Sequence, residues 1–328
     1  MNSDTSDGLN QQGNADIKDH PSEASSSALL TGAALITAGF FANTVQGALG
    51  KQILDAIAPG QFLWLLITLA LLILLPLTIW RSPEDIQAAW NRQTMTFYLL
   101  RAVFGLLGFY LFVWAAGLGS LVSATVLLNT TPVFIPIIGA LFLDKQISKK
   151  LWGAIALGFI GLLLVVQPSH ELLQDPANLL GLGAGLSAAI EFLTVRQLSR
   201  TQTPLVQTLY YLLVGFVLMA PIAIWQWQPL TSSTTAATIC ATVSFLLFQL
   251  LLVKAYQYAE PHQIGVFQYS SVIFAAGIGW LFFKEIPNML MLIGILLITC
   301  GGALSIYLEN LSKLENTDSS NKSKDLLV

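Results

Sequence analysis

Residues 139–145 read Gly-Ala-Leu-Phe-Leu-Asp-Lys, and residues 279–285 read Gly-Trp-Leu-Phe-Phe-Lys-Glu. The two stretches are 140 residues apart, and the same offset aligns Ala-Ala-Gly-Leu at 115–118 with Ala-Tyr-Gln-Tyr at 255–258. Because these matches follow one another in order along the chain, they predict an internal repeat.

Glycine spacing extends the repeat toward the end of each unit. One residue beyond the same offset, Gly153 and Gly161 align with Gly294 and Gly302, so the interval between the two glycines is kept. Single glycine matches recur by chance in membrane helices. An ordered series over roughly 50 residues instead indicates a duplicated unit.

The composition places both units in a lipid bilayer. Of the 328 residues, 55% are hydrophobic and only 10% are charged, and the mean hydropathy is +0.69. Soluble globular domains carry about 25% charged residues. The composition therefore excludes a water-soluble enzyme, a nucleic-acid binder that relies on a basic face, and a disordered protein. We expect an all-α integral membrane protein.

The two cysteines give no sign of a disulfide framework or a metal site. Cys240 and Cys300 both lie in apolar runs, and neither has a ligand partner at metal-binding spacing. They are expected to act as small packing residues. No metal ion and no cofactor is predicted.

Ten spans are predicted, because about 20 apolar residues are needed to cross the hydrocarbon core as a helix. Residues 1–28 and 310–328 are polar and are expected to be disordered tails, without a signal peptide or a lipidation motif. The spans are expected near residues 29–50, 60–80, 95–117, 122–143, 150–167, 178–197, 204–226, 234–256, 262–283 and 288–308.

Lysine and arginine are unevenly distributed between the two sides of these spans. With a cytoplasmic N-terminus, twelve of the fifteen lie in cytoplasmic segments, only Lys51 and Lys284 lie outside, and Arg101 lies within a span. Positive charge is retained on the cytoplasmic side of membrane proteins. Both termini are therefore predicted to be cytoplasmic.

Each repeat contains five spans, which is an odd number. The first repeat is expected to cover residues 29–168 and the second residues 176–309. An odd number of spans forces the second copy to insert upside down. Inverted repeats form binding sites at their interface near the bilayer midplane and permit alternating access.

At these positions the chain resembles a known family. Leu-Asn-Thr-Thr-Pro-Val-Phe at 128–134, followed by Leu-Phe-Leu-Asp-Lys at 141–145, is similar to the end of an EamA domain. Phe-Gln-Tyr-Ser-Ser at 267–271, followed by Leu-Phe-Phe-Lys-Glu-Ile-Pro at 281–287, is similar to a second copy. The family is the ten-helix EamA-type branch of the drug/metabolite transporter superfamily, and the resemblance covers residues 29–308.

The resemblance implies secondary transport of a small organic metabolite across the cell inner membrane. The stretch from Lys254 to Pro287 is similar to bacterial riboflavin and S-adenosylmethionine carriers. The first repeat departs from the family at Asp144 and Lys145, where a glutamate is usual after a small or basic residue. The family covers many kinds of substrate, so the resemblance does not name one.

Two charged residues stand inside the spans. Glu191, near the middle of the sixth span, is the only carboxylate well inside a span. A carboxylate at this depth is costly in its ionised form, so Glu191 is a candidate for proton exchange or for binding a cationic substrate. Arg101, about 9 Å from the cytoplasmic end of the third span, is a candidate to bind an anionic group or to close a gate with Glu191. Alternatively, the two residues are structural partners, Glu191 is a water-exposed group in the cavity, or Arg101 extends to the headgroups.

Polar clusters occupy matching positions in the fourth and ninth spans. Pro132 deprives the fourth span of one helical hydrogen bond and leaves a carbonyl group that a ligand can use. The hydroxyl groups can instead bond their own helix backbone. The predicted site-lining residues of these clusters are Asn129 and Thr130 in the fourth span and Gln268, Tyr269 and Ser270 in the ninth.

Four further residues are candidates for substrate contact. Asn43 and Gln46 lie about one turn apart on one face of the first span. Tyr110 and Trp114 share a face of the third span and are able to stack on a planar ligand, although aromatic residues in membrane helices also serve as packing or lipid-facing groups.

A secondary transporter is the leading functional hypothesis. A membrane enzyme requires paired carboxylates, a histidine cluster or a nucleophile with a base, and the three histidines lie outside the spans and far apart. A channel lacks support because no charged ring or selectivity-filter motif is present. The expected partners are a small-molecule metabolite and the lipid bilayer, with no nucleic acid. No feature of the sequence indicates the oligomeric state. The substrate, the direction and the coupling ion remain open.

Overall fold

Proline marks the beginning of several of the described helices. Its fixed φ angle suits the first turn of a helix, where its missing N–H group has no helical partner to lose. The computed structural model describes residues 21–89, 92–119, 121–142, 149–167, 176–283, 288–301, 303–304, 307–308 and 311. Within these residues, helices begin at Pro21, Pro59, Pro83, Pro176, Pro204 and Pro261.

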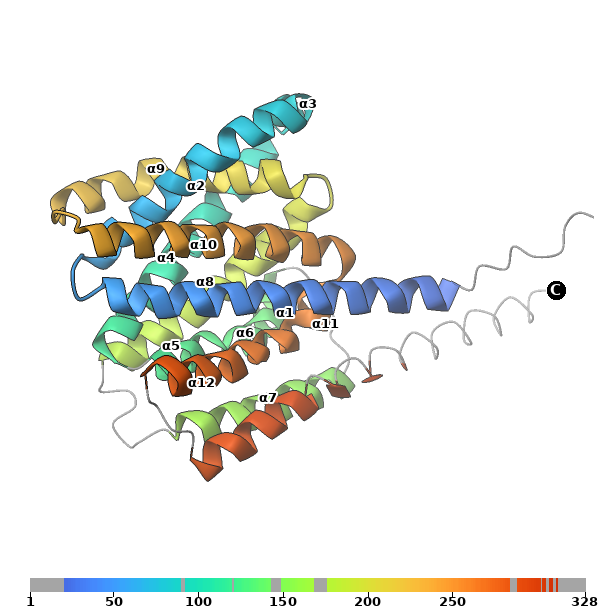
Figure 1. The fold of residues 1–328 in the computed structure, drawn as a ribbon. Coiled ribbons are helices and arrows are strands. Elements are labelled where there is room, and N and C mark those ends of the chain that lie inside the picture. The colour runs from blue at the N-terminus through green and yellow to red at the C-terminus, as the bar shows by residue number, and fades with distance from the viewer. Residues whose placement is uncertain are drawn as a thin grey trace, which may run out of the picture.

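Each of the ten expected spans corresponds to helical structure among the described residues (Figure 1). Seven stretches are long and apolar enough to cross a membrane, and none of the described segments is a strand. The short helix α3 (Pro83–Ala88) lies between the second and third spans. The spans are α1 (Pro21–Ile53), α2 (Pro59–Arg81), α4 (Arg92–Leu118), α5 (Leu121–Leu128) with α6 (Thr131–Phe142), α7 (Lys149–Val166), α8 (Pro176–Ser199), α9 (Pro204–Trp225), α10 (Ser232–Tyr258), α11 (Pro261–Ile264) with the 3₁₀ turn η1 (Gly265–Tyr269) and α12 (Ser270–Phe283), and a last helix, Met289–Gly301.

The first helix begins earlier than the expected first span. Helix α1 begins at Pro21, so residues 21–28 are helical and not part of a disordered tail. Hydropathy marks only the apolar part of a helix, whereas the backbone hydrogen bonds continue into polar sequence until a residue such as proline ends them. Residues 1–20 and 312–328, together with Asp144, Lys145 and Lys284, lie outside the described residues.

The contacts between helices are preserved when the two repeats are interchanged. Helix α1 of the first repeat packs along α10 of the second, and α8, the counterpart of α1, packs along α4, the counterpart of α10. The counterparts α2 and α9 pack against each other, and the contact of α5 with α12 has its equivalent in the contact of α11 with α6 (Figure 1). Contacts that survive exchange of the repeats indicate a pseudo-two-fold relation between them. The chain is an all-α protein of two inverted five-helix repeats.

The last spans of the two repeats cross at their glycines. A Cβ atom at Gly161 would lie 2.6 Å from the carbonyl oxygen of Gly294, and one at Gly301 would lie 2.9 Å from the amide nitrogen of Gly158. The later residues of α7 thus face the earlier residues of the last helix, so the two run antiparallel. Small residues permit this approach of two backbones in a membrane.

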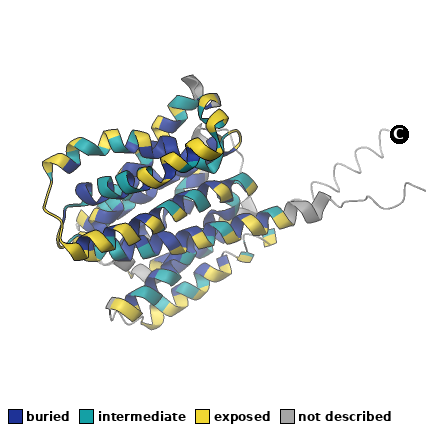
Figure 2. Ribbon diagram, turned by 45° about the horizontal axis from the view of Figure 1, so that its top comes forward, coloured by how far each residue is buried: buried dark blue, intermediate teal, exposed yellow. Residues whose placement is uncertain are grey.

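Buried residues fill the interior and apolar residues cover much of the outside (Figure 2). Leu72, Val217 and Phe282 are each about 70% exposed, which suits contact with lipid chains. Trp80 and Trp225 are exposed at the ends of α2 and α9, where tryptophan anchors helices to the membrane interface. The largest core cluster lies among α1, α2, α4, α8, α9 and α10, and a smaller one joins α7, η1, α12 and the last helix.

Candidate functional site

A small cavity, here called the central cavity, lies between the two repeats inside the main core. Its polar lining comes from Asn43 of α1, Glu191 of α8, Tyr211 of α9 and Gln249 of α10. Its volume is about 40 Å³, which is enough for a few water molecules and far below the several hundred Å³ of a metabolite pocket. In the conformation described the cavity is therefore too small to hold a metabolite.

Glu191 is the charged group of the central cavity. Its side chain is only 6% exposed, and the Oε1 atom has no hydrogen-bond partner. The carboxyl group lies directly against α4, because a Cβ atom at Gly105 would be 2.7 Å from its Cδ atom and 2.8 Å from Oε1. Glycine at this position thus makes room for the carboxylate, and the carboxylate retains an unused acceptor.

Arg101 is fully buried, and its guanidinium group is held by the protein. One terminal nitrogen, Nη1, donates to the backbone oxygen and to Oε1 of Gln207, at 2.8 and 3.0 Å, and Nη2 donates to Oε1 of Gln249 at 3.0 Å. The guanidinium carbon also lies 5.0 Å from the ring centroid of Tyr211. Arg101 and Glu191 make no direct ion pair, so Arg101 braces three helices and does not occupy the acceptor of Glu191.

The small residues of α4 admit helix α8. Besides the contact of Gly105 with Glu191, a Cβ atom at Gly108 would lie 3.2 Å from Cβ of Ser187 and 3.3 Å from the backbone oxygen of Ala184. Close backbone approach of this kind is what glycine permits in membrane helix pairs. Gly105 and Gly108 lie four and seven residues after Arg101. The space that they leave therefore sets how closely α8 packs against α4.

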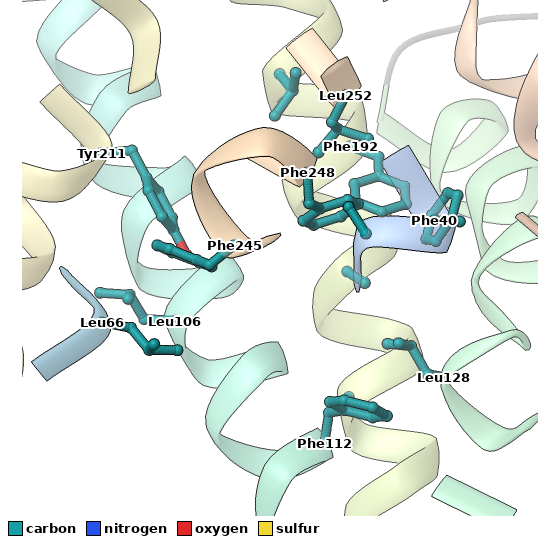
Figure 3. Packing of buried hydrophobic residues seen from close by; sticks show 14 of the residues in the cluster. Phe40, Leu66, Leu106, Phe112, Leu128, Phe192, Tyr211, Phe245, Phe248 and Leu252 are labelled. Carbon is teal, nitrogen blue, oxygen red and sulfur yellow. The ribbon is translucent and has the colours of Figure 1, made fainter. Parts of the chain in front are cut away.

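Aromatic rings form one wall of the central cavity. We call Phe40, Phe192 and Phe248 the aromatic wall (Figure 3). The ring centroids of Phe40 and Phe192 lie 6.1 Å apart and those of Phe40 and Phe248 lie 5.5 Å apart, in edge-to-face and tilted arrangements. Phe109 and Phe112 of α4 add two more rings to the lining. The cavity thus combines one carboxylate and two amides with an apolar aromatic surface.

The two broken spans meet at their breaks. Asn129 lies in the turn between α5 and α6, and its Nδ2 atom donates to Oγ of Ser271, at 2.8 Å, across the repeat interface. Ser271 donates in turn to the backbone oxygen of Gln268, at 2.7 Å. Interrupted helices at matching places in two inverted repeats are a recurring feature of carriers. Sequence analysis found the polar clusters, and the structure pairs them.

The carbonyl group that Pro132 leaves without a helical partner is Leu128 O, four residues earlier. It accepts hydrogen bonds from Oγ1 of Thr131, at 2.6 Å, and from Nε2 of Gln268, at 3.3 Å. The expectation that a ligand can use this oxygen therefore does not apply to the conformation described. The protein itself supplies the donors, one of them from the other repeat.

The structure brings only some of the other candidates to the cavity. Asn43 lines it. Gln46 is fully buried with neither amide atom hydrogen-bonded, but it is not part of the lining. Thr130 donates to the backbone oxygen of Leu127, at 2.7 Å, beside Gly185 of α8.

Tyr269 and Ser270 are separate from the central cavity. Tyr269 belongs to the smaller core cluster, where a Cβ atom at Gly158 of α7 would be 2.5 Å from the Cε2 atom of its ring. Its hydroxyl group and that of Ser270 are buried without hydrogen-bond partners. Their position places them toward the paired last spans and not between α1, α4 and α8.

Tyr110 and Trp114 are not part of the lining of the central cavity, and Trp114 lies near the C-terminal end of α4. Their ring centroids lie 5.8 Å apart, and Trp114 is 41% exposed. Trp114 lines a second, larger pocket of about 440 Å³ together with Lys51 and Asp55 at the end of α1. The two aromatic residues thus contact each other as expected, at an outer pocket.

Sequence reasoning missed three polar residues of the site: Gln207, Gln249 and Tyr211. Each is a polar side chain inside an apolar span, the same signal that selected Glu191 and Arg101. The aromatic wall gave no such signal, because phenylalanine in a membrane span is ordinary. Only the packing of α1, α8 and α10 brings its three rings together.

Ion pairs connect the end of α8 to the beginning of α11 in the second repeat. Arg196 of α8 and Arg200, the residue after that helix, contact Oε1 of Glu260 at 2.8 and 3.3 Å, and Glu260 caps α11. Lys254 lies 5.5 Å from the ring centroid of Tyr258 and is exposed, as expected for a side chain that extends to the membrane surface. The charged residues of these helix ends are thus engaged at some distance from Glu191.

Both repeats match one known protein family. Residues 30–167 and residues 175–307 each match the sequence model of the EamA-like transporter family. Together these two regions cover most of the chain and coincide with the two halves of the structure.

Three characterised relatives are similar to this chain. The pseudopaline exporter CntI of Pseudomonas aeruginosa is 28% identical, covering 64% of this chain and 74% of the exporter. A riboflavin transporter of Vibrio cholerae is 27% identical, covering 67% and 73%. An S-adenosylmethionine uptake transporter of Rickettsia bellii is 23% identical, covering 65% and 72%.

One solved crystal structure resembles the fold. It has a TM-score of 0.64 at 14% identity and covers 87% of this chain and 97% of its own. At this level of identity the likeness speaks for the fold alone.

Proposed function

Because the chain belongs to the EamA-like transporter family, we propose that it is a secondary-active transporter that moves a small polar organic metabolite across the cell inner membrane by alternating access. One observation carries the proposal: the cavity around Glu191 lies between the two repeats and takes its walls from both. In inverted-repeat carriers, rocking of one repeat against the other opens such a site to each side in turn.

The size of the central cavity supports a carrier. A cavity of about 40 Å³ cannot contain a metabolite, so the repeats must separate before a substrate enters. A continuous pore would not need this movement. The ion pairs of Glu260 with Arg196 and Arg200 are contacts that opening toward the cytoplasm would break.

We place both termini in the cytoplasm. This orientation puts the end of α8 with Arg196 and Arg200 inside the cell, and the pocket lined by Lys51 and Trp114 outside. In this arrangement Trp114 stands at the outer approach to the central cavity.

Glu191 is the proposed site of proton exchange. It is a buried carboxylate with an unused acceptor, it lies at the interface that must open, and Arg101 does not neutralise it through an ion pair. A carboxylate in these surroundings can bind a proton in one state of the cycle and release it in another. The pH gradient across the inner membrane would then drive transport.

The relatives guide the choice of substrates to test. Their names give a pseudopaline exporter, a riboflavin transporter and an S-adenosylmethionine uptake transporter, so they include carriers in both directions. We propose a metabolite of similar size for this chain. The direction of transport would follow from the gradients of the proton and the metabolite.

The test begins with metabolite profiling of cells with and without the protein, followed by labelled uptake into proteoliposomes under an imposed pH gradient. We expect saturable uptake that responds to the gradient, and we expect Glu191→Gln to abolish the response. Glu84→Gln in the short helix α3, where the side chain is exposed, is the matched control and should transport normally.

Non-saturable flux through the protein would contradict the carrier. Uptake by Glu191→Gln that equals wild type at every pH would contradict proton exchange at Glu191 and leave the carrier in place.

A further inference from the structure

The Oε1 atom of Glu191 has no hydrogen-bond donor within the protein. The carboxylate is buried against Gly105, and its Oε1 atom receives no hydrogen bond. A buried acceptor without a donor costs about 1–3 kcal/mol, and a charged one costs more. Such a group in a cavity is a place for a ligand that brings its own donor or positive charge.

The basic side chains nearest to the site make their hydrogen bonds and ion pairs with residues other than Glu191. The guanidinium group of Arg101 donates to Gln207 and Gln249 and lies over the ring of Tyr211. Arg196 and Arg200 pair with Glu260. No lysine or arginine whose side chain the structure describes makes an ion pair with Glu191.

The surroundings of Glu191 favour a cation over a neutral polar group. Phe40, Phe192 and Phe248 line the same cavity, and the ring centroid of Phe40 lies 6.1 Å from that of Phe192 and 5.5 Å from that of Phe248 (Figure 3). Phenyl rings give a neutral polar group no hydrogen bond in return for its lost water. They attract an organic cation through their negative faces, more strongly once water is excluded.

Resting on the transport function proposed above, we propose that the group recognised in the central cavity is an organic ammonium ion, bound between the carboxylate of Glu191 and the aromatic wall. Glu191 supplies the charge, the aromatic wall receives the alkyl groups around the nitrogen, and Asn43 and Gln249 offer amides to the rest of the molecule. Substrates of this carrier are thus amines or alkylammonium compounds.

Binding to the purified full chain in lipid nanodiscs tests this inference. The probes are choline and benzylammonium, each compared with a neutral isostere in which carbon or oxygen replaces the charged nitrogen. We expect each cation to bind at least about tenfold more tightly than its isostere, and Glu191→Gln to remove the difference. Glu191→Asp keeps the charge and should retain part of the preference.

The aromatic wall has a matched control in the next residue along the chain. Phe40→Leu should weaken cation binding by about threefold to tenfold and leave the isostere unaffected. Phe41 is 50% exposed and contacts Phe274, so Phe41→Leu should change neither. This pair and the isostere comparison keep the inference testable if Glu191→Gln does not fold.

The inference is overturned if neither cation binds more tightly than its isostere, or if Glu191→Gln binds both cations as wild type does. Saturable transport of a metabolite without a cationic group, dependent on Glu191, would also overturn it while leaving the carrier intact. Absence of saturable transport for any solute would instead contradict the transport function.

Discussion

The carboxyl group of Glu191 occupies the space that a side chain at Gly105 would need, because a Cβ atom on Gly105 would lie 2.7 Å from the carboxyl carbon of Glu191. The two residues come from different repeats, 86 positions apart in the chain. The first repeat thus shapes the pocket and the second supplies its charge. This division explains why neither repeat alone contains the site.

Gly105→Ala is expected to impair the site directly. The added methyl group meets the Glu191 carboxyl group and, at 2.9 Å, the Tyr211 ring, so it must displace the carboxylate. We expect a loss of about 1–3 kcal/mol in stability and a larger relative loss of substrate affinity. Thermal unfolding and binding in nanodiscs measure the two effects. Gly277→Ala, where a Cβ atom meets nothing within 4 Å, should behave as wild type.

Arg101→Met is expected to destabilise the bundle and not merely slow transport. Removal of the guanidinium group leaves three oxygen acceptors on Gln207 and Gln249 without their donor. Unpaired buried acceptors cost about 1–3 kcal/mol each, so we expect a marked fall in the unfolding temperature. Arg81→Met, at the exposed end of α2, is the control. An unfolding temperature equal to wild type would show that Arg101 is not a brace.

Asn129 and Ser271 are expected to couple the two repeats. The Nδ2 atom of Asn129 donates a hydrogen bond to Oγ of Ser271, at 2.8 Å, across the interface. A double-mutant cycle with Asn129→Ala and Ser271→Ala should give a coupling of about 0.5–1.5 kcal/mol in unfolding free energy. Thr125→Val, nearby on α5 with an unpaired hydroxyl group, should be neutral with respect to Ser271. Additive single effects would contradict the coupling.

The proposed orientation predicts which residues are accessible from outside the cell. In a variant with Cys240 and Cys300 replaced by alanine, Ser233→Cys at the start of α10 should react with an impermeant maleimide in intact cells. Thr201→Cys, after α8, should react only after lysis. Labelling in the reverse order would invert the proposed topology.

The sequence by itself determined the spans, their orientation as a prediction, and the duplication. Each is a property of consecutive residues: hydropathy over about 20 positions, the location of basic residues, and the recurrence of a motif. The two residues that it selected inside the bilayer, Glu191 and Arg101, are both buried beside the interface of the repeats. A charge in an apolar span is visible without any structure, because its cost in lipid is high wherever it points.

Only the tertiary structure decided what these polar groups contact. The sequence left Arg101 as a partner of Glu191 or a ligand for an anion, and the structure gives its hydrogen bonds to Gln207 and Gln249 instead. The aromatic wall and the use of Leu128 O by Gln268 were likewise beyond the sequence. These contacts join residues about 100 or more positions apart, and their geometry depends on how helices pack. Glycines such as Gly105 set that packing through the space they leave, which no local pattern records.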